Sequence, residues 1–143
     1  MSRNIVVAIL CCTLFSAVCL AQQSYQPKFN GDPARSDKEA AALGYMRVVT
    51  NAEYLYHQKH SVYATSLAQL VGHGSFTRRM VSTTRGDYTV KFQGGTKSYA
   101  LWMTPAQPQP DLRAFFVNES GNIRAEEDKA AGPDSPKVGA SPR

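Results

Sequence analysis

The chain has 143 residues, a formal net charge of +5 and 43% hydrophobic residues, which is typical of one small globular domain. Its cysteines, Cys11, Cys12 and Cys19, all lie near the start, so the rest of the chain has no disulfide and no cysteine-based metal or redox site. Acidic and basic residues are interspersed, unlike the basic stripe of a dedicated nucleic-acid binder. Composition therefore predicts a single domain held together by a hydrophobic core.

Residues 1–21 have the layout of a secretory signal peptide. Arg3 supplies a positive charge, an apolar run follows, and Cys19 and Ala21 place small residues at −3 and −1 before a cleavage site at Gln22. We therefore expect a periplasmic or secreted protein with no stable membrane insertion after cleavage. The alternative is an uncleaved membrane anchor, because the apolar run approaches the roughly 20 residues that span a bilayer.

A helix is predicted over residues 37–60, after a polar, proline-containing stretch at 22–35 that we interpret as an extended arm. Ser36 and Glu39 form a capping box, in which each side chain bonds the main-chain amide of the other. Glu53 falls on the solvated side of this helix. Apolar residues recur at spacings of three and four and predict the buried side: Ala41, Tyr45, Val48, Val49, Ala52, Leu55 and Tyr56.

The remaining chain predicts short strands. After a short helical segment at 65–70 and a loop at 75–86, the alternation of apolar residues indicates strands at 88–92 and 98–104. A hairpin with strands at 113–117 and 122–125 follows. Residues 126–143 are polar and proline-rich, so we expect a disordered tail.

These elements predict an α+β fold, with one long amphipathic N-terminal helix packed on a three- to four-stranded antiparallel sheet. We expect the buried side of the helix to contact one face of that sheet. The strand residues expected at this contact are Tyr88, Val90, Leu101 and Phe115.

Residues 36–125 resemble the globular head of type IV pilins and type II secretion pseudopilins. The resemblance rests on three segments: Tyr63-Ala64-Thr65-Ser66-Leu67-Ala68-Gln69-Leu70, the strands at 88–92 and 99–102, and the hairpin at 115–124. It implies a non-enzymatic structural or protein-interaction module of the cell envelope, with a protein partner and a link to pilus or type II secretion machinery.

The chain departs from the prepilin pattern near its start. No glycine precedes the expected cleavage point, the first acidic residue is Asp32, and residues 22–35 are polar and contain two prolines. Pilins have a long apolar helix there, through which they pack along a filament axis. We therefore expect a pilin-like head that is exported by the general route, does not build filaments by itself and remains monomeric or weakly associated.

Two groups of residues form the candidate interaction surface. Trp102 lies on the opposite strand face from Leu101 and Met103, where with Phe116 it would form an exposed aromatic patch. The second group is basic and consists of Arg78, Arg79 and Arg85. It supports the alternative function, a periplasmic module that binds an anionic polymer such as DNA.

No catalytic motif is present, so we expect no enzyme, no cofactor and no metal site. A zinc site usually has three or four protein ligands, and no acidic residue or cysteine near His57, His60 and His73 completes such a set. A small hydrolase is a third hypothesis. Glu53 and Asp87 would serve it as an acid–base pair only if the fold brought them together.

Overall fold

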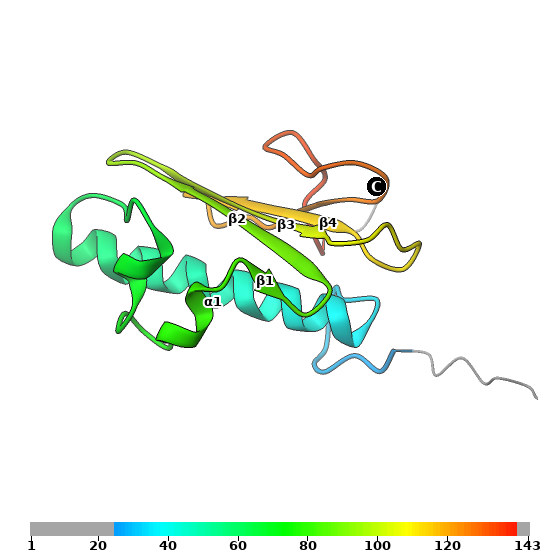
Figure 1. Cartoon of the computed structure of the whole chain (residues 1–143). Coiled ribbons are helices and arrows are strands. Elements are labelled where there is room, and N and C mark those ends of the chain that lie inside the picture. Colours follow the sequence, from blue (N-terminus) through cyan, green and yellow to red (C-terminus); the bar gives the residue numbers. More distant parts are fainter. Residues whose placement is uncertain (1–24, 140–143) are drawn as a thin grey trace, which may run out of the picture.

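The computed structural model describes residues 25–139, so the predicted signal peptide and its cleavage site lie outside the described residues. One helix packs against one face of a five-stranded antiparallel sheet (Figure 1). The elements are α1 (Asp37–His60), the 3-10 turns η1 (Leu67–Leu70) and η2 (Arg78–Val81), and the strands β1 (Thr84–Arg85), β2 (Tyr88–Gly94), β3 (Tyr99–Pro105), β4 (Ala114–Asn118) and β5 (Arg124–Glu126). The fold class is α+β, as predicted.

The sheet has five strands in the order β1-β2-β3-β4-β5, so the prediction of three or four was wrong. The additional strand, β1, lies in the segment expected to be a loop and pairs Thr84 with Thr89 and Arg85 with Tyr88. It is connected to β2 through Gly86, whose φ of 57° is left-handed and therefore suits glycine. Two residues are too few for an alternating apolar pattern, so periodicity does not reveal this strand.

Helix α1 has the predicted bounds. Its N-cap, Ser36, accepts a hydrogen bond from the Glu39 amide at 3.2 Å, as expected of a capping box. The second half of the predicted box is wrong, because the Glu39 carboxylate accepts from the Arg35 amide and from Arg113 instead. Within residues 25–139, no helix is long and apolar enough to cross a membrane.

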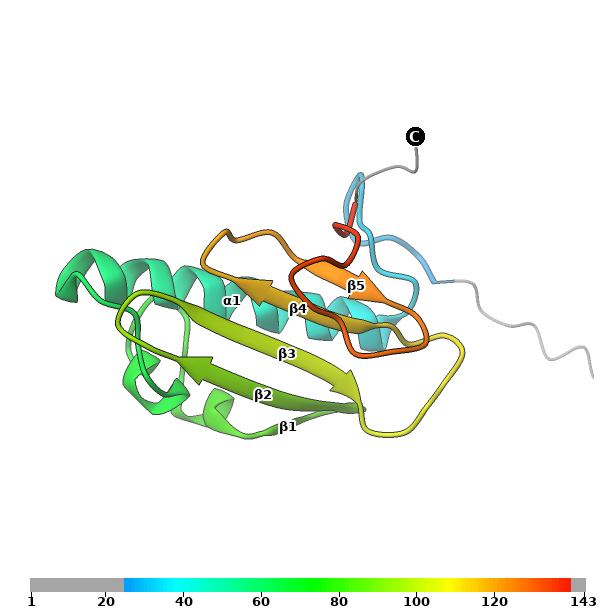
Figure 2. The same ribbon diagram turned by 90° about the horizontal axis from the view of Figure 1, so that it is seen from above.

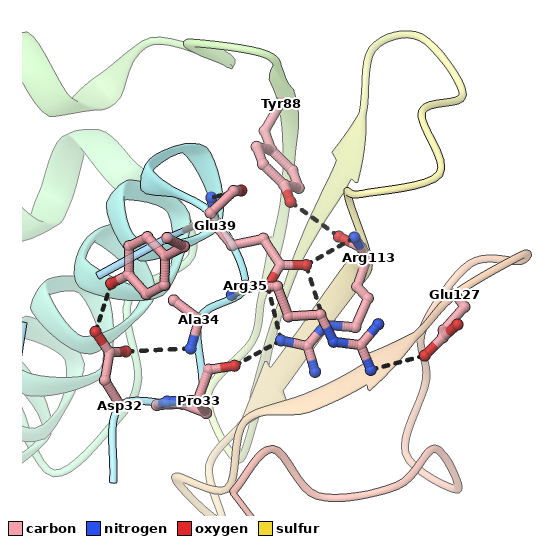
Figure 3. A network of polar contacts seen from close by, with 10 residues as sticks. Asp32, Pro33, Ala34, Arg35, Glu39, Tyr88, Arg113 and Glu127 are labelled. Carbon is pink, nitrogen blue, oxygen red and sulfur yellow. Dashed lines mark hydrogen bonds and ion pairs between the residues drawn. The ribbon is translucent and has the colours of Figure 1, made fainter. Parts of the chain in front are cut away.

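The start of α1 is fixed to the start of β4 (Figure 3). Arg113 donates from its guanidinium to the Glu39 carboxylate, at 2.7 Å from Nη2 and 3.0 Å from Nε, and its Nη2 also reaches the Pro33 carbonyl at 2.8 Å. The Arg113 main-chain amide adds a bond of 3.0 Å to the same carboxylate. Glu39 has no exposed surface, so this ion pair joins helix and sheet inside the fold.

The buried side of α1 is rotated from the predicted one. Ala41 is exposed and Leu55 is half-buried, whereas Leu43 and Met46, which the prediction omitted, have no exposed surface. If every position of a set with spacings of three and four is moved by one residue, the new set has the same spacings. Consecutive residues of a helix point in directions about 100° apart, so the two sets lie on different sides of the helix. Spacing alone therefore leaves the rotation of the helix open. The buried residues are Glu39, Ala42, Leu43, Tyr45, Met46, Val49, Ala52 and Glu53.

The strands alternate between two faces of the sheet, as predicted. Their buried residues on the helix side include all four expected ones, Tyr88, Val90, Leu101 and Phe115. Trp102 pairs with Phe116 across β3 and β4 and belongs to a separate small cluster on the outer face.

Residues 126–139 fold back over the outer face of the sheet (Figure 2), where the sequence predicts disorder. The main chain of this segment pairs with β5 and with the residue before it, through bonds from the Ala125 amide to the Pro136 carbonyl and from the Val138 amide to the Ile123 carbonyl. Ala131 is 4% exposed and packs with Phe116. This order depends on main-chain bonds to a strand edge, which amino-acid composition does not reveal.

Candidate functional site

A groove with a volume of about 400 Å³ lies between the second half of α1, the start of β3 and the turn between β4 and β5. Three tyrosines contribute to it, and we call it the tyrosine groove. Residues on several turns of α1 form one wall, since positions 47, 50, 51, 54 and 57 are spaced by three or four. The lining residues are Arg47, Thr50, Asn51, Tyr54, His57, Tyr63, Tyr99, Glu119, Gly121 and Ile123.

The mouth of the groove has unusual aromatic exposure. Within the described residues, Tyr54 and Phe29 are the large hydrophobic side chains that remain exposed, at 59% and 49%. The Arg47 guanidinium lies 5.4 Å from the centre of the Phe29 ring, and Arg47 also lines the groove. Phe29 therefore lies beside one lining residue of the groove. Tyr54 is seven positions further along α1 than Arg47, so the two exposed rings mark two separate points of this surface.

The inner wall of the groove is closely packed. His57 stacks on Tyr63 with ring centres 4.4 Å apart, and Tyr63 contacts Tyr99 at 5.4 Å. Tyr99 is 4% exposed, and burial raises its pKa to about 12, so its hydroxyl stays neutral. At Gly94, which pairs with Tyr99, a Cβ would lie 1.9 Å from the Ala64 carbonyl oxygen. Only glycine lets the loop at Tyr63 approach the sheet this closely.

The charges around the groove balance one another. Arg47 and Glu119 contribute opposite charges to the lining, and Asn51 adds a neutral amide. The groove thus offers aromatic faces together with hydrogen-bond donors and acceptors, a combination that fits a neutral ligand with its own polar groups.

Glu53 lies on the core side of the same helix and is fully buried, contrary to the predicted solvated position. Its Oε2 accepts from the Ala64 amide at 3.0 Å, while its Oε1 has no partner. Burial raises the pKa of this carboxyl to about 7. A buried carboxyl with a raised pKa is a common feature of catalytic sites. Here, however, the hydrogen-bond partner of the carboxylate is the main-chain amide of Ala64, which is a structural contact.

The structure does not bring Glu53 and Asp87 together. Asp87 forms an ion pair with Lys38 at 2.8 Å, in the first turn of α1. Glu53 is 15 positions further along the helix, which corresponds to roughly 22 Å. The arrangement therefore does not support these two residues as an acid–base pair.

The predicted aromatic patch is largely covered. Trp102 and Phe116 do contact each other, with ring centres 5.4 Å apart. However, Phe116 is 3% exposed and Ala131 of the C-terminal segment packs in the same cluster. The Lys91 ammonium lies 5.1 Å from the centre of the Trp102 ring. These two aromatic residues thus form a small second core rather than an open surface.

The basic residues are only partly available. Arg78 and Arg79 are exposed in η2. Arg85 is half-buried, lies 4.8 Å from the centre of the Tyr45 ring and donates to the Arg79 carbonyl at 3.2 Å. One of the three cations therefore already has contacts within the fold. The three arginines lie at the β1 edge of the sheet, apart from the Trp102 cluster.

The histidines do not form one site. His57 lines the tyrosine groove, whereas His60 and His73 both contact Tyr56, at ring distances of 4.3 and 5.2 Å, and their own rings lie 6.1 Å apart. In the part of the chain that the structure describes, no three residues among His, Cys, Asp and Glu are grouped so that they could hold a metal ion.

No family model, no curated protein and no solved structure matches this chain. The tyrosine groove must therefore be interpreted from its own residues. Sequence reasoning missed it, although one signal was available: Tyr54 is an aromatic residue among the polar positions of α1, next to Asn51 and Gln58. The other wall comes from loops distant in sequence, and no pattern in the sequence places them there.

Proposed function

We propose that this chain is an exported, non-enzymatic, pilin-like module with a structural or protein-interaction role at the cell envelope, associated with pilus or type II secretion machinery. Its tyrosine groove is the surface that binds the partner. The observation that carries this proposal is the 59% exposure of Tyr54 at the mouth of a groove whose inner wall is packed. An exposed aromatic anchor beside a rigid wall is typical of interface hot spots.

The architecture agrees with this role. A single helix on one face of an antiparallel sheet is the arrangement implied by the resemblance to pilin heads. The hydrogen-bonded Glu39 and Arg113 fix the point where the chain enters α1. Rigid elements on both sides of the groove keep the binding surface preformed, which reduces the entropy lost on binding.

Export can be tested by N-terminal sequencing of the protein from the periplasmic and extracellular fractions of the native host. Cleavage of the signal peptide predicts a mature chain that begins at Gln22. Recovery of the full-length chain in the membrane fraction would instead indicate an anchored protein and contradict this part of the proposal.

The binding surface can be tested by photo-crosslinking in the same host. A benzoylphenylalanine at position 54 should give an adduct with one envelope protein, and the Tyr63→Ala change should reduce its yield because the groove wall is lost. The matched control is the same residue at Thr89, which is exposed on β2 and does not line the groove. Equal adducts from both positions, or none from position 54, would contradict the proposed surface.

A further inference from the structure

We propose that Asn30 is a site of spontaneous modification, at which the main-chain nitrogen of Gly31 displaces ammonia from the Asn30 side chain and water then leaves a new carboxylate beside Arg47. This inference goes beyond the proposed function and does not depend on it. It follows from four properties of the described residues: the order Asn30-Gly31, the exposure of both residues, their free polar groups and their position next to Arg47.

The reaction needs only water, since asparagine is itself a chemically labile residue. The Gly31 nitrogen attacks the Asn30 Cγ, and a new C–N bond closes a cyclic imide. The bond from Cγ to the amide nitrogen breaks, and ammonia leaves with the proton of the Gly31 amide. Water then opens the ring at one of its two carbonyl carbons. Opening at Cγ gives aspartate, whereas opening at the main-chain carbon gives isoaspartate, in which the chain runs through the former side chain.

Gly31 is the residue that this attack requires. A side chain on the residue after asparagine hinders the approach of its nitrogen, and glycine has none. A Cβ at Gly31 would have no atom within 4 Å, so neighbouring parts of the fold do not crowd the site either. Asn30 and Gly31 are both exposed, so water reaches the ring that the attack forms.

The reacting groups are not held by other bonds. Within residues 25–139, neither the side-chain amide of Asn30 nor the main-chain amide of Gly31 has a hydrogen-bond partner. The two residues lie at the centre of a turn in which the Asp32 amide donates to the Phe29 carbonyl at 3.1 Å. Rotation of Asn30 toward the Gly31 nitrogen therefore opens this turn, while the reacting groups themselves have no bond to lose.

The new charge lies beside the tyrosine groove. Phe29, on one side of Asn30, has its ring centre 5.4 Å from the Arg47 guanidinium. Asp32, on the other side, has a pKa below its ordinary value, first because of the hydrogen bond from Tyr25 and also because of the charge of Arg47. Arg47 contributes a positive charge to the lining of the groove. A carboxylate at position 30 therefore lowers the positive potential that Arg47 provides there.

Peptide mapping by mass spectrometry tests the modification. The exported protein is incubated at neutral pH, and loss of the side-chain amide at Asn30 is compared with that at two other exposed asparagines, Asn51 and Asn122. Asn51 is in the middle of α1, and Asn122 precedes Ile123, which is branched at Cβ. Asn30 should react at least several-fold faster than either, and an isoaspartyl methyltransferase should label the same peptide. Asn30→Gln keeps the amide but would need a larger ring, so it should stay unchanged.

The position of the new charge is tested with charge-matched variants. Asn30→Asp has the charge of the product, whereas Gln93→Glu adds the same charge at a residue that is exposed on β2 and does not line the groove. Asn30→Asp should shift the NMR signal of the Arg47 side chain, and Gln93→Glu should leave it unchanged. Circular dichroism verifies that each variant is folded.

Three results would overturn the inference. If Asn30 kept its amide as long as Asn51 and Asn122, or reacted only after unfolding in urea, the turn would protect it in the folded protein. Conversion to aspartate without isoaspartate would exclude the cyclic imide. An Arg47 signal that responded equally to both added charges would place the new carboxylate away from the groove.

Discussion

Glu39 and Arg113 form a buried ion pair in which each oxygen of the carboxylate has two donors. Oε1 accepts from the Arg113 main-chain N and from its Nε, both at 3.0 Å. Oε2 accepts from Arg113 Nη2 at 2.7 Å and from the Arg35 amide at 2.9 Å. The pair therefore joins the arm before α1, the first turn of α1 and the start of β4.

Removal of one partner of this pair should be strongly destabilising. Arg113→Ala leaves the Glu39 carboxylate charged and fully buried, so the free energy of unfolding should fall by about 3–5 kcal/mol. Urea unfolding followed by circular dichroism measures this. Lys129→Ala, which changes an exposed ion pair with Glu126, is the control and should alter stability by less than about 1 kcal/mol. A similar small loss for Arg113→Ala would contradict the structural role of the pair.

The same pair should make the protein sensitive to acid. Burial raises the pKa of Glu39, but the hydrogen bonds from Arg113 and Arg35 outweigh it, so the pKa lies below its ordinary value of 4.5. The folded state therefore releases this proton more readily than the unfolded state. Its contribution to stability is present above pH 4.5 and is lost as the pH falls through the lowered pKa. Urea unfolding of Glu39→Gln between pH 2 and 5 should show a weaker dependence on pH than that of the unchanged protein.

Glu53 should have the opposite effect at higher pH. Its pKa is raised by burial to about 7, from an ordinary 4.5, so between these values the folded state binds more protons than the unfolded state. Stability should then decrease as the pH rises from 4.5 to 7, by at most about 3 kcal/mol, and level off above 7. Glu53→Gln should remove this decrease and be more stable than the unchanged protein at pH 8. Thermal unfolding at several pH values measures both effects, and equal pH profiles would show that Glu53 does not titrate in this range.

Two leucines of α1 should distinguish the observed rotation of the helix from the predicted one. Leu43 has no exposed surface, so Leu43→Ala should lower the free energy of unfolding by about 2–5 kcal/mol. Leu55 belonged to the predicted buried side but is half-buried, and Leu55→Ala should have a smaller effect. Urea unfolding of the two variants gives the order directly. A larger loss at Leu55 would favour the predicted side.

Local signals predicted the elements that depend on local chemistry. Ser36 marks the residue before the helix because its side chain can cap the helix. The alternation of Tyr88, Val90 and Phe92 marks a strand because the two faces of a strand differ in burial. Features that depend on distant partners were not predictable in this way. Glu53 looks solvated in a helical pattern, and only the approach of the Ala64 amide gives its carboxylate a buried hydrogen bond.

The tyrosine groove illustrates the same limit at the candidate site. Tyr54, His57 and Asn51 come from one helix, and their common side follows from helical spacing. Tyr63, Tyr99 and Glu119 come from a loop, a strand and a hairpin turn. Their meeting depends on how the sheet packs on α1, which is a tertiary property. For the same reason the Trp102 patch was expected to be open, since the segment that covers it was expected to be disordered.

The contact between that segment and Trp102 provides the last prediction. Trp102 is the single tryptophan of the chain, so fluorescence excited selectively at the indole ring, and not at the tyrosines, reports on this site. Removal of residues 127–143 deletes Ala131, which packs beside Trp102 and Phe116. It also deletes Ser135, whose main-chain carbonyl accepts a hydrogen bond of 2.7 Å from Arg124. The emission maximum should therefore shift to longer wavelength, because water reaches the indole ring, and quenching by acrylamide should increase. The control is removal of residues 140–143, which should leave the spectrum unchanged. If the longer truncation also left the spectrum and the quenching unchanged, residues 126–139 would not cover the outer face of the sheet in solution, and the aromatic patch predicted from the sequence would be open after all.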